Sequence, residues 1–172
     1  MSNPRIFKKL PKNAICAEIG VWLGWTTERL IQTCQPKKLH LIDPYVLYKN
    51  DPPRLKKAKT QQGMDQIFLQ VSKKLVNKDV IFHRGRSQVV VCGFLDNYFD
   101  WIYIDGDHSY QAVKQDLTLY YHKVKTGGLI TGDDYEWGPG KPVKKAVHEF
   151  IKDFNVELIE VDQDGQYIIK KK

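Results

Sequence analysis

The sequence has few cysteines and no long hydrophobic run. Its three cysteines, Cys16, Cys34 and Cys92, are odd in number and never share a CxxC spacing. This pattern argues against a disulfide framework or a cysteine zinc site and fits a reducing compartment. No stretch approaches the roughly 18 apolar residues that a membrane span requires. The N-terminal segment also lacks the apolar region of a secretory signal, so we expect a cytoplasmic protein without a membrane partner.

The composition favours one globular domain with a basic surface. Of the 172 residues, 42% are hydrophobic and 27% are charged, which is ordinary for a single domain with its own core. We therefore expect residues 1–172 to form one domain, in which residues 1–13 are a short N-terminal extension. The net charge of +7 fits either a solvated surface or an anionic partner, and we favour the solvated surface.

Short apolar runs alternate with helix-period stretches along the chain. The runs predict strands at Ala14–Gly20, Leu39–Asp43, Val80–His83, Trp101–Asp105, Gly128–Thr131, Val156–Val161 and Tyr167–Lys170. Apolar residues at helical spacing predict helices over 62–77, 109–124 and 142–154, and a further helix should follow Gly24. This alternation predicts an α/β layered fold with a mostly parallel sheet. The turn at 162–166 predicts a closing hairpin, which makes one strand antiparallel.

The first predicted strand leads into a glycine-bearing turn, AEIGVWLGWTT at 17–27. Its spacing is Glu-x-Gly-x-x-x-Gly, and it matches neither the Gly-x-Gly-x-x-Gly of dinucleotide sites nor a phosphate loop. Glycine permits a tight turn and close approach of the backbone to a ligand. Because ligands of open α/β sheets bind at the carboxyl ends of the strands, this turn is either an ordinary connection or part of a ligand site.

Two further strand ends carry polar groups that suit a nucleoside. Asp43 ends the second predicted strand, where a carboxylate can accept hydrogen bonds from ribose hydroxyls. Ser87 and Gln88 follow the third strand in RGRSQ and can hydrogen-bond the edge of an adenine. The three strand ends together predict a nucleoside site more specifically than any one of them alone.

The motifs, in order, are EIGxxxG, LID, RGRS, DWIYIDGDHSYQAVKQDL, GGLITGDDY and PGKPVKKAVHEF. This series resembles the class I S-adenosylmethionine-dependent methyltransferases. It is similar to the small-molecule O-methyltransferase branch that includes the metal-dependent macrolide and aminocoumarin sugar methyltransferases, whose more distant relatives are the catechol and caffeoyl-CoA types. The resemblance runs roughly from residue 14 to residue 150. It implies a Rossmann-like three-layer sandwich, a seven-stranded sheet of order 3-2-1-4-5-7-6, and S-adenosyl-L-methionine as methyl donor.

The same resemblance implies a set of cofactor-binding residues, namely Glu18, Gly20, Trp22, Gly24, Thr26, Asp43, Ser87, Gln88 and Asp105. Within this set Thr26 is expected to reach the methionine carboxylate and Asp43 the ribose. Ser87 and Gln88 are expected to contact the adenine.

Three aspartates follow the next two predicted strands, Asp105 in YIDGDHSY and Asp133 with Asp134 in TGDD. Neighbouring strands lie about 5 Å apart, so the three carboxylates can converge, and they would repel one another unless a cation lies among them. Mg²⁺ or another hard divalent cation would resolve this repulsion, and the related metal-dependent enzymes hold their metal at these positions. The alternative is that these aspartates only cap a helix and form turns.

His108 is the preferred base for removing the acceptor's proton. Asp105 is expected to contribute to catalysis as a ligand of the metal. An imidazole has an ordinary pKa of about 6.5, which suits proton transfer near neutral pH. In the catechol-type relatives a lysine occupies the matching place, so Asp107 stays open as the alternative base. Ser109 is expected to cap the following helix. The remaining histidines are interpreted as structural or without a recognisable metal partner; they are His40, His83, His122 and His148.

These features predict metal-assisted O-methylation of a hydroxyl on a small molecule or sugar. The segment NDPPR at 50–54 superficially resembles the motif of amino-group nucleic-acid methyltransferases, but it follows the wrong strand and ends in Arg54, so we interpret it as a loop. RNA methylation stays open as a less favoured alternative, as does a non-catalytic nucleoside-binding module of the same fold.

The acceptor side is expected to be open, or to be closed by residues 44–60, by residues 136–141 or by a second subunit in a homodimer. Four aromatic residues could form a wall there for a sugar or a planar ring; they are Tyr45, Tyr48, Tyr135 and Trp137.

Overall fold

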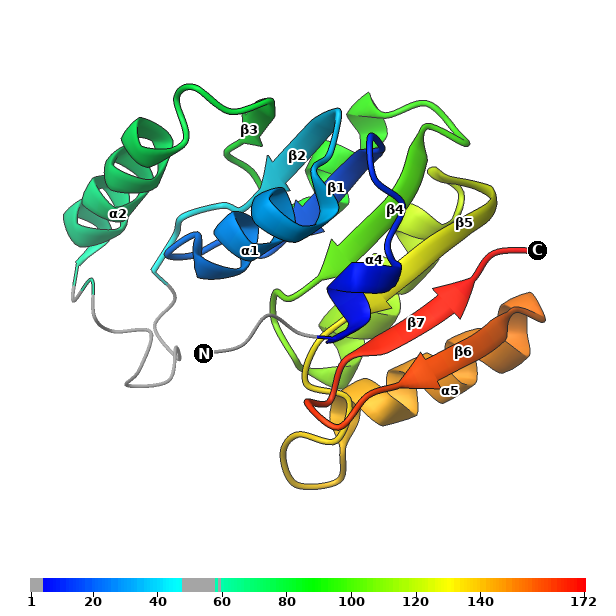
Figure 1. The fold of residues 1–172 in the computed structure, drawn as a ribbon. Helices are drawn as coiled ribbons and strands as arrows, with labels where there is room; N and C mark the ends of the chain where they lie inside the picture. Colours follow the sequence, from blue (N-terminus) through cyan, green and yellow to red (C-terminus); the bar gives the residue numbers. More distant parts are fainter. Residues whose placement is uncertain (1–4, 48–57, 59) are drawn as a thin grey trace.

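A twisted sheet forms the centre of the computed structural model, which describes residues 5–47, 58 and 60–172 (Figure 1). The strands are β1 (Ile15–Ile19), β2 (Lys38–Ile42), β3 (Val80–His83), β4 (Phe99–Ile104), β5 (Val124–Gly132), β6 (Glu157–Val161) and β7 (Tyr167–Lys170). They form a 7-stranded sheet of order β3-β2-β1-β4-β5-β7-β6. Only β7 runs antiparallel to its neighbours, β5 and β6. The predicted α/β fold, strand order and closing hairpin are therefore confirmed.

Helices connect the strands on both sides of the sheet. They are the 3₁₀ helix η1 (Arg5–Lys9), α1 (Trp25–Cys34), α2 (Gln61–Lys74), α3 (Ser87–Val90), the 3₁₀ helix η3 (Val91–Gly93), α4 (Tyr110–Tyr121) and α5 (Pro142–Phe154). The helix predicted over 109–124 ends earlier, because Val124 already belongs to β5. The short α3 and η3 were not predicted, since four or three residues are too few to show a helical period. None of the helices in the described ranges is long and apolar enough to span a membrane.

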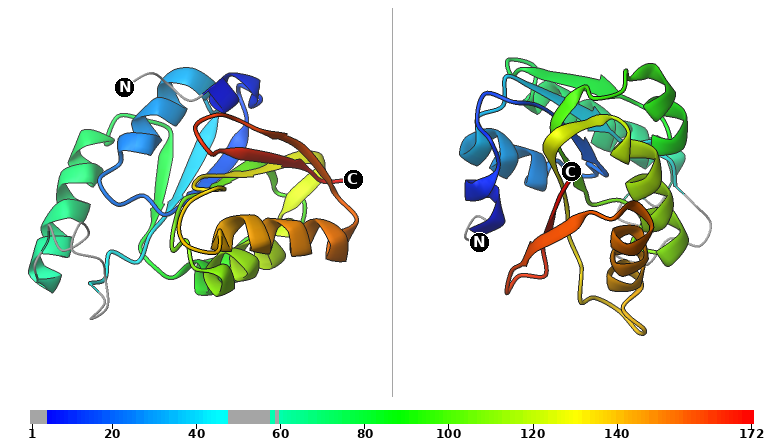
Figure 2. Two further views of the ribbon diagram at one scale, coloured as in Figure 1. Left: turned by 90° about the horizontal axis from the view of Figure 1, so that it is seen from below. Right: turned by 90° about the vertical axis from the view of Figure 1, so that its right-hand side faces the viewer.

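The alternation of side chains along the strands explains the three layers. Cys16 and Trp101 point to the face covered by η1, α1 and α2, and they lie in one buried cluster with residues of those helices. Their neighbours Ala17 and Ile102 point to the opposite face and pack with α4 and α5 in a second cluster. Figure 2 shows α1 and α4 on opposite sides of the sheet. Successive residues of a strand face opposite sides, so the central strands are buried on both faces.

Local sequence signals set the starts of the longer helices. The hydroxyl of Ser109 accepts a hydrogen bond from the backbone N–H of Ala112, at 3.4 Å, and so caps α4 as predicted. Thr60 caps α2 in the same way through the N–H of Gly63. Pro142 occupies the first turn of α5, where its missing N–H costs nothing. The loops that precede α4 and α5 lie at the carboxyl edge of the sheet because they follow the parallel strands β4 and β5.

A histidine pair joins the middle of β2 to the last residue of β3. The Nδ1 atom of His40 is 2.8 Å from Nε2 of His83, and Nε2 of His40 is 3.1 Å from the hydroxyl of Tyr98. His40 is only 4% exposed. Burial, together with the neighbouring His83, lowers the pKa of His40 to about 4. The pair is therefore a neutral, hydrogen-bonded part of the core at pH 7, which agrees with the structural interpretation of His40.

Candidate active site

The turn after β1 lies directly against the turn after β4. Gly20 has a φ of +90°, and a β-carbon added to it would lie 2.2 Å from the backbone carbonyl oxygen of Asp105. Gly24, with a φ of +72°, forms the N-cap of α1. Both positions therefore use the freedom of glycine, the first for close backbone approach and the second for a left-handed conformation. The predicted glycine turn is thus at the carboxyl edge of the sheet, beside the loop that holds Asp105.

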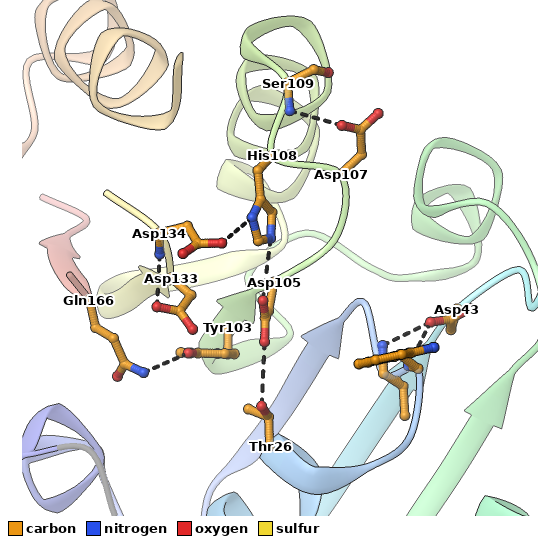
Figure 3. Close-up of polar contacts among 12 residues, drawn as sticks. Thr26, Asp43, Tyr103, Asp105, Asp107, His108, Ser109, Asp133, Asp134 and Gln166 are labelled. Atoms are coloured by element: carbon orange, nitrogen blue, oxygen red, sulfur yellow. Dashed lines mark hydrogen bonds and ion pairs between the residues drawn. The ribbon is translucent and has the colours of Figure 1, made fainter. Parts of the chain in front are cut away.

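Asp43 holds this turn in place from the end of β2. Its Oδ2 atom accepts hydrogen bonds from the backbone N–H groups of Val21 and Trp22, each at 2.9 Å. Its Oδ1 atom accepts another from the N–H of Tyr45, at 2.7 Å. Figure 3 shows the carboxylate against the turn. Trp22 has a φ of 46°, an uncommon conformation for a bulky residue. The carboxylate therefore stabilises the shape of the turn, and Oδ1 keeps lone-pair capacity for a further donor.

Glu18 presents a buried carboxylate beneath the turn. Its side chain is 0% exposed, and its Oε2 atom accepts a hydrogen bond from the hydroxyl of Thr27 at 2.6 Å. Its Oε1 atom has no hydrogen-bond partner among the described residues. Burial raises the pKa of Glu18 well above its ordinary value. Because a buried polar atom without a partner is costly, Oε1 suits a bound donor or cation.

The residues predicted for adenine lie at the start of α3. The hydroxyl of Ser87 donates to Oδ1 of Asp116 at 2.6 Å, and Oε1 of Gln88 lies 3.5 Å from the same hydroxyl. Asp116 comes from α4 and is buried. Burial raises the pKa of Asp116 to about 6. Sequence reasoning missed Asp116, although a signal existed: it is an acidic residue beside Leu117 and Tyr120 in the buried part of α4.

The acidic residues at the ends of β4 and β5 converge around His108. The Nε2 atom of His108 is 3.4 Å from Oδ1 of Asp105, and its Nδ1 atom forms an ion pair with Oδ2 of Asp134. Asp133 accepts the backbone N–H of Asp134 at 2.8 Å. Figure 3 shows the imidazole between Asp105 and Asp134, with Thr26 on the other side of Asp105. The hydroxyl of Thr26 is 3.4 Å from Oδ2 of Asp105.

The imidazole offsets part of the negative charge in this cluster. Burial alone would lower the pKa of His108, but its contacts with Asp105 and Asp134 outweigh burial and raise the pKa to about 10. Burial, together with the charge of Asp105, raises the pKa of Asp133 to about 6. His108 is therefore an imidazolium at pH 7 and supplies one positive charge, which lies between Asp105 and Asp134. To act as a base it would first have to lose this proton.

The arrangement does not support the predicted metal site. The described part of the chain contains no group of three or more histidine, cysteine, aspartate or glutamate residues placed to hold a metal ion. Asp105 and Asp134 direct carboxylate oxygens at the imidazole, so the ring of His108 lies where a shared cation would be needed. The donor types suit Mg²⁺, but these residues do not form a metal site as they are arranged.

Asp107, the alternative base, has a different environment from the other aspartates. Its side chain is exposed, and its Oδ1 atom accepts the backbone N–H of Ser109 at 2.8 Å. In Figure 3 its carboxylate points away from Asp105, Asp133 and Asp134. This contact helps to shape the entry into α4.

The predicted aromatic wall is only partly formed. Tyr45 and Tyr135 are 1% and 3% exposed, so that prediction was wrong for both of them: they belong to the core. Tyr48 lies outside the described residues. Trp137 is 45% exposed, and its ring stands edge-on to His108 with the centroids 5.9 Å apart. Sequence reasoning missed Trp25, which is 56% exposed and packs edge-on against Trp22.

Residues 17–135 match the family model described as Methyltransferase domain. The chain belongs to this family. The match spans the turn after β1, the strand ends with Asp43 and Asp105, and the Asp133–Asp134 pair, which are the elements of the site described above. The sheet order is that of the class I S-adenosylmethionine-dependent methyltransferases, and the resemblance to their O-methyltransferase branch is supported.

Relatives of this methyltransferase-domain chain include viral and bacterial proteins. An uncharacterised protein of Acanthamoeba polyphaga mimivirus is 32% identical over 139 residues, which cover 79% of this chain and 58% of the viral protein. Demethyldecarbamoylnovobiocin O-methyltransferase from Streptomyces niveus is 42% identical over 66 residues, which cover 37% of this chain and 24% of that enzyme. The aligned parts thus span less than two thirds of either relative.

Solved structures share the fold of this methyltransferase domain. A proposed methyltransferase from Streptococcus mutans, in complex with SAH, superimposes with a TM-score of 0.65 at 15% identity and covers 100% of both chains. A proposed rRNA methylase from Clostridium thermocellum gives a TM-score of 0.64 at 16% identity, covering 97% of this chain and 94% of its own. At these identities the likeness concerns the fold alone.

Proposed function

We propose that this protein transfers a methyl group from S-adenosyl-L-methionine to a hydroxyl of a small molecule or sugar. The observation that carries the proposal is the contact between the Gly20 turn and the Asp105 loop, which brings a cofactor cradle and an acidic, histidine-containing cluster to one edge of the sheet. Ligands of open α/β sheets bind at this edge. Membership of the methyltransferase domain family supports the same conclusion.

Three groups of the chain suit the parts of the cofactor. The unpartnered Oε1 atom of Glu18 can accept a hydrogen bond from the ammonium group of the methionine moiety. The free lone pair on Oδ1 of Asp43 can accept one ribose hydroxyl while the other contacts of this carboxylate hold the turn. Ser87 lies at the expected adenine end. The chain would thus bind the cofactor through existing acceptors without rearranging the turn.

The reaction would be a direct displacement. The acceptor oxygen attacks the methyl carbon, the carbon–sulfur bond breaks, and sulfur keeps the bonding electron pair as S-adenosylhomocysteine is formed. The hydroxyl proton must leave to a base. Holding the two reactants in line can supply up to about 7–11 kcal/mol of the barrier. The chain's main contribution would therefore be orientation between the Gly20 turn and the His108 cluster.

His108 and Asp107 remain the candidates for the base. His108 is closer to the converged carboxylates but carries a proton held by Asp105 and Asp134. Asp107 is exposed and would need to turn toward the acceptor. The metal prediction for Asp105, Asp133 and Asp134 also remains to be tested: a divalent cation would have to displace the imidazole from between Asp105 and Asp134.

The acceptor would bind beside Trp137. This exposed ring stands next to His108, and a sugar or planar ring stacked on it would place a hydroxyl near the cluster. The partial similarity to an O-methyltransferase that acts on demethyldecarbamoylnovobiocin supports a small-molecule hydroxyl. RNA methylation is the second candidate, favoured by the net charge of +7 and by the fold shared with a proposed rRNA methylase.

Calorimetry followed by an activity screen would test this proposal. We expect S-adenosylhomocysteine to bind the purified protein, and we expect methyl transfer from labelled cofactor to sugars or phenols rather than to RNA. The screen is run with Mg²⁺ and with EDTA to decide metal dependence. Asp105→Ala should abolish transfer while the far-ultraviolet dichroism stays unchanged. Binding without transfer to any acceptor would favour the non-catalytic module, and no binding at all would refute the methyltransferase proposal.

A further inference from the structure

We propose that Asp116, acting through Ser87, makes the nucleoside pocket selective for the exocyclic amino group of adenine. This inference rests on the proposed function, because it assumes that an adenosine-containing cofactor binds at the start of α3. Asp116 is then a positioning residue: it need not touch the ligand, and it determines which hydrogen-bonding role the Ser87 hydroxyl can play.

The hydroxyl proton of Ser87 has one strong hydrogen-bond acceptor within reach. Oδ1 of Asp116 lies 2.6 Å from the hydroxyl oxygen, whereas Oε1 of Gln88 lies at 3.5 Å. A short hydrogen bond to an ionised carboxylate is markedly stronger than a long one to an amide. Asp116 is only 6% exposed, so little water competes for its oxygen. The hydroxyl proton of Ser87 is therefore directed at Asp116.

The position of Ser87 is fixed independently of its hydroxyl. The hydroxyl of Tyr120 donates to the backbone carbonyl oxygen of Ser87 at 3.1 Å. Tyr120 and Asp116 both come from α4, one helical turn apart. The helix therefore holds Ser87 by two contacts, of which only the Asp116 contact sets the direction of the hydroxyl proton.

The direction of its proton decides how the Ser87 hydroxyl can bond to a ligand. A serine hydroxyl has one hydrogen to donate and two lone pairs with which to accept. Because Asp116 takes the hydrogen, Ser87 can only accept from a ligand. The exocyclic amino group of adenine is a donor and satisfies this acceptor. The carbonyl oxygen at the same position of hypoxanthine is an acceptor, so the two oxygens would face each other without a proton between them.

The test compares S-adenosylhomocysteine with its deaminated analogue S-inosylhomocysteine, which has a carbonyl oxygen in place of the amino group and a proton on the adjacent ring nitrogen. The Asp116 and Ser87 variants then isolate the part of the discrimination that depends on the Ser87 hydroxyl. We expect calorimetry to show that the wild-type protein binds the adenosyl ligand at least about tenfold more tightly, because the inosyl carbonyl would leave the Ser87 acceptor unpaired; tenfold corresponds to about 1.4 kcal/mol. In Asp116→Ala the freed hydroxyl can rotate and donate, so the ratio should fall below about threefold. Ser87→Ala removes the acceptor itself and should lower the ratio in the same way.

Tyr120→Phe serves as the matched control, because it removes the other contact between α4 and Ser87 and leaves the Asp116 contact in place. It should keep the wild-type ratio even if both affinities fall. A wild-type ratio near one, or an Asp116→Ala protein with the wild-type ratio, would overturn the inference while leaving the proposed function intact. If the wild-type protein binds neither ligand, the proposed function fails and the inference fails with it.

Discussion

Gly20 and Asp105 are in contact through their backbones, at a distance that leaves no room for a side chain on Gly20. An added β-carbon would lie 2.2 Å from the carbonyl oxygen of Asp105. This contact joins the turn after β1 to the loop after β4, and so it joins the expected cofactor cradle to the cluster around His108. The site therefore depends on close backbone approach as well as on its polar side chains.

Gly20→Ala should disrupt this contact. The substitution introduces both a clash with backbone atoms and a side chain at a φ of +90°, so we expect it to lower the free energy of unfolding by more than about 2 kcal/mol and to abolish binding of S-adenosylhomocysteine. Gly127→Ala is the control: its φ is +77°, and an added β-carbon would meet nothing within 4 Å. It should cost only about 1–2 kcal/mol. Urea titration measures the stability of both variants, and calorimetry measures their binding of S-adenosylhomocysteine. An equal loss of stability in the two variants would contradict the role of the clash.

Asp43→Asn should loosen the turn after β1. Both carboxylate oxygens of Asp43 accept backbone N–H groups, Oδ2 from Val21 and Trp22 and Oδ1 from Tyr45. The asparagine amide has only one oxygen. Its NH₂ group would therefore face one of these backbone N–H donors, which costs about 1–3 kcal/mol. We expect calorimetry to show at least about tenfold weaker binding of S-adenosylhomocysteine. Asp79→Asn, an exposed change before β3, should leave the affinity unchanged; if both variants behave alike, the turn is not held by Asp43.

His108→Gln and Asp107→Asn together identify the base. If His108 removes the proton, His108→Gln should lower kcat by about 10²–10⁴-fold, whereas Asp107→Asn should change kcat little. The reverse result would assign the base to Asp107. Steady-state rates at saturating cofactor measure the effect, and calorimetry with S-adenosylhomocysteine checks that the cofactor site survives in both variants.

Trp137→Ala should weaken acceptor binding selectively. Trp137 is 45% exposed and stands beside His108, so its removal takes away a stacking surface for the acceptor without touching the Gly20 turn. We expect the KM for the acceptor to rise about tenfold while the Kd for S-adenosylhomocysteine stays the same, which corresponds to about 1.4 kcal/mol. Leu95→Ala, at another exposed side chain, is the control. An unchanged acceptor KM would exclude Trp137 from the acceptor site.

His40 should make stability depend on pH. Its pKa is lowered to about 4 in the folded protein, below the ordinary value of about 6.5 in an unfolded chain. The folded state then binds fewer protons between these values, so stability falls as the pH drops from about 6.5 to 4. We expect His40→Gln to remove up to about 3 kcal/mol of this dependence. Urea unfolding at pH 7.5 and 4.5 measures it, with the exposed His122→Gln as control; equal pH dependence in all three proteins would contradict the assignment.

The sequence was sufficient to predict the seven strands, the four longer helices and the edge of the sheet where the strand ends meet. Hydrophobic period distinguishes strands from helices, and strand ends of a parallel sheet share one edge. The placement of Gly20, Asp43 and Asp105 at that edge followed from these rules and from the family resemblance. The Ser109 cap was predictable as well, because a cap depends on residues within one turn.

The partners of the polar side chains were not predictable in the same way. The pairing of His108 with Asp105 and Asp134 depends on how the loops after β4 and β5 fold over the sheet. The contact between Ser87 and Asp116 depends on how α3 packs against α4. No sequence period encodes either arrangement. Aromatic residues in loops are equally ambiguous: Tyr135 is buried while Trp137, two residues later, is 45% exposed. Such details arise from tertiary packing, which overrides local preference.

The hydrogen bonds that Asp43 accepts tie the expected cofactor cradle to the end of β2 as well as to the end of β1. In the β1–β2 register Ile19 lies opposite Ile42, and Asp43 follows directly, level with the turn that it holds. A slip of β2 by one residue would turn this carboxylate toward the other face of the sheet. The turn with Trp22 therefore takes its hydrogen-bonded shape only when β2 is paired in this register. We therefore expect substitutions that shift the alignment of β2 to weaken cofactor binding, even where they lie far from the ligand.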